Sequence, residues 1–293
     1  MWGYQTADAM DGRQGKRVGM YVHPSTELFD HGIDGLVTTF SGIPSIDLLG
    51  LGRTPRLASL HLCCVWSHFY RTTWRHLYTG KLTFSAGIAN PTERLVFAVS
   101  LCLFLGFNPH TLDTTVEHIG TYVAPALLIP KWTGSLQIRE VLIVTEVAST
   151  VSIYARDFSN LVSGRQPLRP GLSICQLAPL FLLWCFSLMY FWEADAPRDE
   201  DRATILTLAA FVNLSIFFHL IICEMTKTCF PAAWIVMSTL PSLASVFFAR
   251  RQESLRVIQV VATIGALRFC ALWLRFQRAV VYYCGMDGPF SVQ

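Results

Sequence analysis

The stretch ATILTLAAFVNLSIFFHLIIC, residues 203–223, has no Asp, Glu, Lys or Arg. It is long enough to cross a bilayer core, which takes about 20 predominantly apolar residues in a helix. Similar runs occupy 96–107, 171–192 and 230–248, and less uniform ones occupy 28–50, 57–74, 138–163 and 256–284. The sequence therefore predicts an all-α fold: a polytopic membrane helix bundle of about eight transmembrane helices, preceded at 1–11 by the end of a truncated one.

The composition agrees with a membrane protein. The 293 residues are 52% hydrophobic and 15% charged, whereas soluble domains carry roughly 25% charged residues. The nine cysteines form no C-x-x-C pair, so neither a zinc site nor a disulfide framework is indicated. We expect a single membrane domain over 1–293, with a motif region at 1–90 and the remaining bundle at 91–293. We expect no nucleic acid as a partner.

Charge distribution predicts an orientation. In an alternating arrangement of spans, RQGKR (13–17), Arg71, Arg75, Lys81, Arg165 and Arg169 fall on one side, and EADAPRDED (193–201) falls on the other. Excess Lys and Arg mark the cytosolic side. Arg53, Arg56, Arg250 and Arg251 fall on the opposite side from the other basic groups. The balance places the segment Asp8–Asp34 at the cytosolic face.

That segment holds four aspartates and a histidine between apolar stretches. Asp8 and Asp11 are spaced i, i+3, and Asp30 and Asp34 are spaced i, i+4, so each pair shares a helix face, with His31 about a quarter turn away. Carboxylate oxygens suit magnesium or manganese. Two further residues favour a phosphate ligand, because Gly12 permits close approach and Lys16 adds positive charge.

These residues resemble the signature D-x-x-D-G…D-x-x-x-D of the CDP-alcohol phosphatidyltransferase family. YQTADAMDGRQGKR (4–17) and ELFDHGID (27–34) are similar to its eukaryotic choline/ethanolamine phosphotransferase branch. Further matches are Trp74 with YTGKL (78–82), PTE (91–93) and EMTK (224–227). The resemblance is strong over about 1–95 and thin but collinear beyond.

The chain also departs from the family pattern. The family's Ala-Arg is Gly15-Lys16 here, the glycine before ELFDHG is Thr26, and one extra residue lies between Arg17 and Pro24. Lysine keeps the charge of arginine but not its bidentate geometry. Family members carry a first membrane helix and most of a second ahead of D-x-x-D, so we expect the chain to be a fragment.

The resemblance implies an integral membrane enzyme of the endoplasmic reticulum or Golgi with its active site facing the cytosol. It would transfer phosphoethanolamine or phosphocholine from CDP-ethanolamine or CDP-choline to diacylglycerol or alkylacylglycerol. The implied metal ligands for two Mg²⁺ or Mn²⁺ ions are Asp8, Asp11, Asp30 and Asp34, with Gly12 and Lys16 at the substrate. The implied base is His31, or Asp34 as in the wider family. Membrane lipids and a second copy in a homodimer are the other implied partners.

Other interpretations stay open. The chain could use CDP-diacylglycerol as donor, or it could be a non-catalytic homologue with a regulatory role. A transporter is less favoured, because no inverted repeat is evident. Glu93, Glu146 and the pair Arg156-Asp157 could line a polar cavity or form ion pairs within the bundle. Arg268, Arg275 and Arg278 on the last span are expected to meet lipid headgroups or to snorkel.

Overall fold

The computed structural model is all-α over the residues that it describes, which confirms the predicted class. These residues are 24–79, 100–115, 135–163, 174–192, 199–226 and 255–284, with residues 10, 13, 17, 228, 230–233, 235–237, 239 and 240. An isolated β-bridge joins Thr115 and Gln137.

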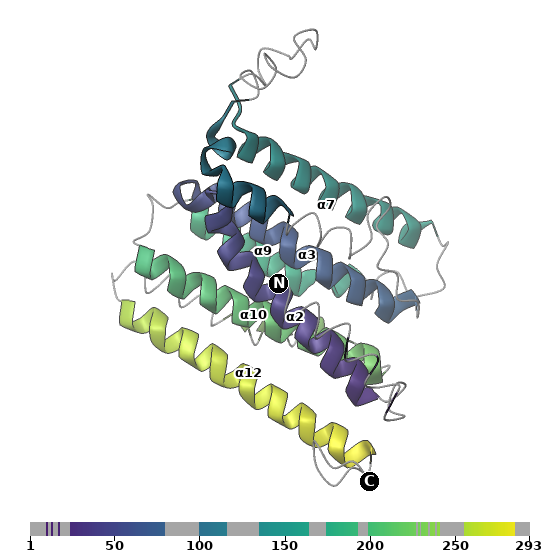
Figure 1. The fold of residues 1–293 in the computed structure, drawn as a ribbon. Helices are drawn as coiled ribbons and strands as arrows, with labels where there is room; N and C mark the ends of the chain where they lie inside the picture. Colours follow the sequence, from purple (N-terminus) through teal and green to yellow (C-terminus); the bar gives the residue numbers. More distant parts are fainter. Residues whose placement is uncertain are drawn as a thin grey trace. The chain divides into compact units, whose positions relative to one another are not determined.

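The described helices match the predicted apolar runs closely. The α-helices are α2 (Pro24–Leu48), α3 (Pro55–Thr79), α7 (Ile138–Val162), α9 (Ala178–Trp192), α10 (Asp199–Thr226) and α12 (Leu255–Cys284), and the 3₁₀ helices are η1 (Leu51–Arg53) and η2 (Pro109–Asp113) (Figure 1). Residues 100–107 are helical, as are all the described residues of 232–240. The rest of the predicted runs 96–107 and 230–248 lies outside the described residues.

One described stretch, Ile205–Glu224 in α10, is long and apolar enough to cross a membrane, with a mean hydropathy of 2.3. That stretch coincides with the run at 203–223. The eight predicted spans as a set stay a prediction.

The chain divides into two compact units. The first comprises Met1–Phe40, Gly171–Phe186 and Pro197–Gln293, and the second comprises Ser41–Pro170 and Ser187–Ala196. Helix α2 begins in the first unit and ends in the second. Whether the whole chain behaves as one membrane domain stays a prediction.

In the first unit, α10 and α12 pack side by side along their length (Figure 1). Their contact contains a buried cluster of Leu214, Phe218 and Phe269. The Phe218 ring meets the Phe269 ring edge-on at a centroid distance of 5.1 Å and the Trp273 ring at 5.0 Å. Edge-to-face pairs at this separation are a favoured aromatic geometry, so the two helices have a defined register.

In the second unit, α3 packs against α7. The largest buried side chains of α3 are Trp66, Tyr70 and Trp74, each no more than 1% exposed. The C-terminal part of α2 joins them through Gly42, where an added Cβ atom would lie 3.0 Å from Cδ2 of Leu62. Because small residues let helix backbones approach closely in membrane bundles, Gly42 allows α2 to contact α3.

Candidate functional site

The structure describes the second half of the aspartate motif, on α2. Asp30 and Asp34 lie within this helix and are half-buried, and His31 is 8% exposed. The helix begins at Pro24, whose ring geometry suits a first helical position. The predicted helical spacing, which sets both carboxylates on one face, is therefore present.

Gly32 fixes which way that face points. A Cβ atom at Gly32 would lie 3.1 Å from Cζ of Phe218 and 3.6 Å from Cζ3 of Trp273. Each aspartate is two residues from Gly32, or about 160° around a helix of 3.6 residues per turn. The glycine face of α2 is thus packed against α10 and α12, and the carboxylate face is turned away from them.

Two further contacts hold α2 against α10. Thr39 and Asn213 are both 0% exposed, and the Asn213 side-chain amide donates a hydrogen bond of 3.0 Å to the Thr39 hydroxyl. One residue along, the Phe40 and Phe211 rings meet edge-on at 5.5 Å. With Gly32 opposite Phe218, these contacts run in opposite directions along the two chains, so the helices are antiparallel here.

The first half of the motif precedes α2 in the chain. Asp8, Asp11, Gly12 and Lys16 lie outside the described residues. No group of three or more His, Cys, Asp or Glu side chains that could hold a metal ion occurs among the residues that are described. The four-aspartate site is therefore still a prediction, of which the structure supplies one helix.

A separate polar cluster joins three helices in the second unit. The Ser45 hydroxyl on α2 lies 2.7 Å from Nε2 of His61 on α3, whose Nδ1 lies 2.8 Å from Oε2 of Glu146 on α7. The spacing resembles a Ser-His-carboxylate triad, which is recognised by geometry. However, the Ser45 hydroxyl also donates to the Gly42 carbonyl at 2.6 Å. We interpret the cluster as an interhelical clamp.

A buried ion pair lies along the same interface. Arg71 on α3 donates from Nε to Oδ2 of Asp157 on α7 at 2.5 Å, with side chains 3% and 2% exposed. Arg75 Nη1 lies 3.7 Å from Oδ1 of the same carboxylate. The sequence suggested that Glu146, Arg156 and Asp157 pair with one another. Instead, Asp157 pairs with Arg71 and Arg75 of α3, and Glu146 contacts His61 of α3.

Comparison with known proteins identifies the group to which these elements belong. No protein-family model matches the chain. It is 35% identical over 232 residues to an uncharacterized CDP-alcohol phosphatidyltransferase class-I family protein of Schizosaccharomyces pombe, covering 78% of this chain and 58% of that protein. The chain belongs to the CDP-alcohol phosphatidyltransferase class-I family. The predicted resemblance is confirmed.

The chain is also similar to proteins that are named as phosphotransferases. It is 27% identical over 237 residues to cholinephosphotransferase 1 of Xenopus laevis, covering 77% of this chain and 53% of the relative. It is 25% identical over 233 residues to choline/ethanolaminephosphotransferase 1 of Saccharomyces cerevisiae, covering 78% and 58%. The chain thus spans about half the length of the curated relatives it matches.

Several contacts of this family member were not anticipated from its sequence. The glycine of the D-H-G triplet, Gly32, was part of the motif, but its contact with Phe218 joins positions far apart in the chain. The Ser45–His61–Glu146 clamp likewise carries no local spacing signal. The one sequence signal for this clamp is that His61 and Glu146 lie within apolar runs. Polar side chains at such positions are costly unless they are paired.

Proposed function

We propose that the protein transfers phosphocholine or phosphoethanolamine from its CDP ester to the hydroxyl of diacylglycerol or alkylacylglycerol and releases CMP. The observation that supports this most directly is the carboxylate pair Asp30 and Asp34, with His31 beside it, on a helix whose opposite face is fixed by Gly32. The similarity to choline and choline/ethanolamine phosphotransferases points to the same substrate class.

The donor set fits a hard divalent cation. Asp30 and Asp34 offer carboxylate oxygens from adjacent turns of one helix, and such oxygens suit Mg²⁺ and Mn²⁺. In the proposal, Asp8 and Asp11 complete the ligand set for two ions. When bound, the ions would neutralise charge on the attacking and departing oxygens of the donor diphosphate.

The residues of the chain have distinct parts in the transfer. His31 takes the proton of the acceptor hydroxyl as general base, since histidine is the side chain that most often has this part in proton transfer. The acceptor oxygen then bonds to the phosphorus that carries choline or ethanolamine, and the bond from that phosphorus to the CMP oxygen breaks. Lys16 pairs with the diphosphate, and Gly12 gives it room. If Asp34 binds metal, its basicity falls, which favours His31 as the base.

The low exposure of His31, 8%, suits this role. A buried base beside half-buried carboxylates can act where water is scarce, so the acceptor hydroxyl competes better with hydrolysis of the donor. Diacylglycerol would enter laterally from the bilayer. The proposal includes an integral membrane location in the endoplasmic reticulum or Golgi, with the site facing the cytosol.

The test measures lipid products from membranes that carry the full-length protein. Membranes receive diacylglycerol with labelled CDP-choline or CDP-ethanolamine. We expect His31→Ala to lower product formation by about 100-fold or more, since a general base contributes about 10²–10⁴-fold. Asp30→Asn should also lower it strongly, because it removes a carboxylate ligand from the metal site. Asp47→Asn is the matched control, because Asp47 is an exposed carboxylate on the same helix outside the motif, and it should retain full activity.

Removing metal gives an independent readout. A chelator should abolish transfer, and added Mg²⁺ or Mn²⁺ should restore it in the parent and in Asp47→Asn but not in Asp30→Asn. Transfer that survives in Asp30→Asn and His31→Ala would contradict the assigned roles. A parallel assay supplies CDP-diacylglycerol with a soluble alcohol. Product formed only in that assay would favour the alternative donor, and absence of product in both assays would favour the non-catalytic homologue.

A further inference from the structure

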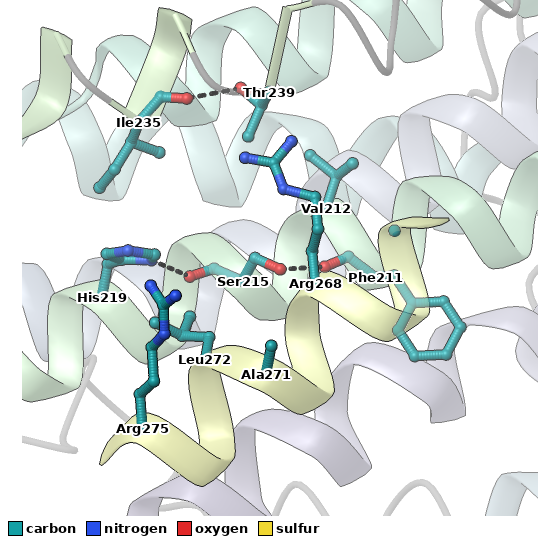
Figure 2. Close-up of a pocket in the computed structure, with 11 residues that line it drawn as sticks. Phe211, Val212, Ser215, His219, Ile235, Thr239, Arg268, Ala271, Leu272 and Arg275 are labelled. Carbon is teal, nitrogen blue, oxygen red and sulfur yellow. Dashed lines mark hydrogen bonds between the residues drawn. The ribbon is translucent and has the colours of Figure 1, made fainter. Parts of the chain in front are cut away.

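A cavity of about 330 Å³ lies in the first unit between α10, α12 and the segment that carries Ile235 and Thr239. Arg268 and Arg275 enter it from α12, and His219 enters it from α10. In Figure 2 the two arginine side chains rise from α12, Arg275 beside His219 and Arg268 toward Thr239. No described lining residue is acidic.

The two arginines are spaced i, i+7, so they lie two turns apart on one face of α12. Other polar groups of the lining are used within their own segments. The Ser215 hydroxyl donates to the Phe211 carbonyl at 2.8 Å, the Thr239 hydroxyl to the Ile235 carbonyl at 2.9 Å, and the His219 Nδ1 to the Ser215 carbonyl at 2.8 Å. Arg268 and Arg275 bring guanidinium groups to the cavity, and each guanidinium carries several N–H donors and a permanent positive charge.

The surroundings of these charges are apolar. Leu267 and Leu274 directly precede the two arginines and are 63% and 56% exposed, and Val260 and Ile264 on the same side are 57% and 48% exposed. The opposite wall, on α10, belongs to the stretch long and apolar enough to cross a membrane. The two positive charges thus lie beside apolar surface, an arrangement that suits a ligand with both an anionic group and apolar chains.

The cavity is separate from the aspartate face. On α12, Trp273 contacts the glycine face of α2. Arg275 is two residues further on and so lies about 160° away around the helix. The arginines of the cavity therefore lie on a different side of α12 from the contact with Gly32, although one lining residue, Phe211, also meets Phe40 of α2.

We propose that this cavity binds the phosphate group of an anionic phospholipid, with Arg268 and Arg275 on the phosphate oxygens and the acyl chains along the exposed apolar residues of α12. Guanidinium groups pair with phosphate through two parallel hydrogen bonds. The exposed Leu and Val side chains favour a phosphate that carries acyl chains over a free one. The site is distinct from the proposed transfer site, and its occupancy does not depend on that activity.

The test is thermal unfolding of the full-length protein in neutral detergent, titrated with three probes. Dioctanoyl phosphatidic acid carries both phosphate and chains, dioctanoylglycerol carries the chains alone, and inorganic phosphate carries the anion alone. We expect phosphatidic acid to raise the melting temperature. Its apparent Kd should increase about tenfold or more in Arg268→Gln and in Arg275→Gln, since a charge-assisted bond contributes about 1.5–3 kcal/mol.

Arg278→Gln is the matched control, because Arg278 is an exposed arginine of α12 that does not line the cavity; it should bind phosphatidic acid like the parent. Arg268→Lys and Arg275→Lys keep the positive charge. If these variants still bind phosphatidic acid more tightly than the Gln variants do, the weaker binding of the Gln variants reflects the lost charge and not a folding defect. The proposal would be overturned if Arg268→Gln and Arg275→Gln weakened the binding of dioctanoylglycerol as much as that of phosphatidic acid. It would also be overturned if neither variant changed the Kd for phosphatidic acid. If inorganic phosphate bound with the same Kd as phosphatidic acid, the site would be a free-phosphate site and not a phospholipid site.

Discussion

Gly32 on α2 lies so close to Phe218 on α10 that a methyl group at position 32 would sit 3.1 Å from Cζ of the ring. Contacts at this distance force a neighbour to move by a few tenths of an ångström. The carboxylates of Asp30 and Asp34 are carried by the same helix on its other side, so any displacement of α2 also displaces them.

We therefore expect Gly32→Ala to lower transfer activity by about tenfold, because small misplacements of reacting groups are costly. The effect on stability should be smaller. Overpacking costs about 1–3 kcal/mol, while alanine gains about 1 kcal/mol over glycine in a helix. The measurements are product formation in membranes and thermal unfolding in detergent.

Gly106→Ala is the control for that change, because no atom of the described residues lies within 4 Å of a Cβ atom at position 106. Adding Phe218→Leu to Gly32→Ala removes part of the ring that the methyl group meets and should recover some activity. If Gly32→Ala behaves like Gly106→Ala, the contact does not position the carboxylates.

Asn213 forms a formal glycosylation sequon with Leu214 and Ser215, yet it is 0% exposed and bonded to Thr39. We expect no glycan at this position, and treatment with a glycosidase should leave the mass of the tryptic peptide that contains it unchanged. Asn213→Leu should lower the free energy of unfolding by about 1–3 kcal/mol, because the buried Thr39 hydroxyl loses its donor. Asn108→Leu, at an exposed asparagine, should have little effect, and a glycan on Asn213 would disprove the buried placement.

The buried pair of Arg71 and Asp157 should stabilise the contact between α3 and α7. Arg71→Met leaves a carboxylate that is 2% exposed without its closest partner, and breaking such pairs costs about 3–5 kcal/mol. The double variant Arg71→Met, Asp157→Leu should recover most of that loss, since an apolar replacement of both partners is often neutral. Thermal unfolding measures both, with the exposed neighbour Arg156→Gln as control. A double variant no more stable than the single one would argue against a direct pair.

His61 should act as a clamp and not as a catalytic base. We expect His61→Ala to lower the free energy of unfolding by about 1–3 kcal/mol, because Ser45 and Glu146 both lose a hydrogen-bond partner. The specific activity of the protein that remains folded should be unchanged. His110→Ala, at an exposed histidine of η2, serves as the control. An activity loss in His61→Ala without a change in stability would assign His61 to the chemistry instead.

The sequence alone was sufficient for the class of fold and for the motif. Long apolar runs predict helices, because a segment that is removed from water must satisfy its backbone hydrogen bonds within itself. The runs at 138–163 and 256–284 match α7 and α12 within one residue at either end. The spacing of Asp30 and Asp34 likewise determines that they share a face, since it depends only on helical geometry. The family of the chain was also predicted from this motif, and the comparison with known proteins confirms it.

The tertiary structure decided which side chains meet. Phe218 lies far from Gly32 in the sequence, and Asn213 far from Thr39, so neither contact is encoded in a local spacing. The same holds for the partners of Asp157 and Glu146, which come from α3. Helical periodicity gives each helix a buried face but not the helix that covers it. That choice depends on how small residues and aromatic rings fit together, which only the packed chain determines.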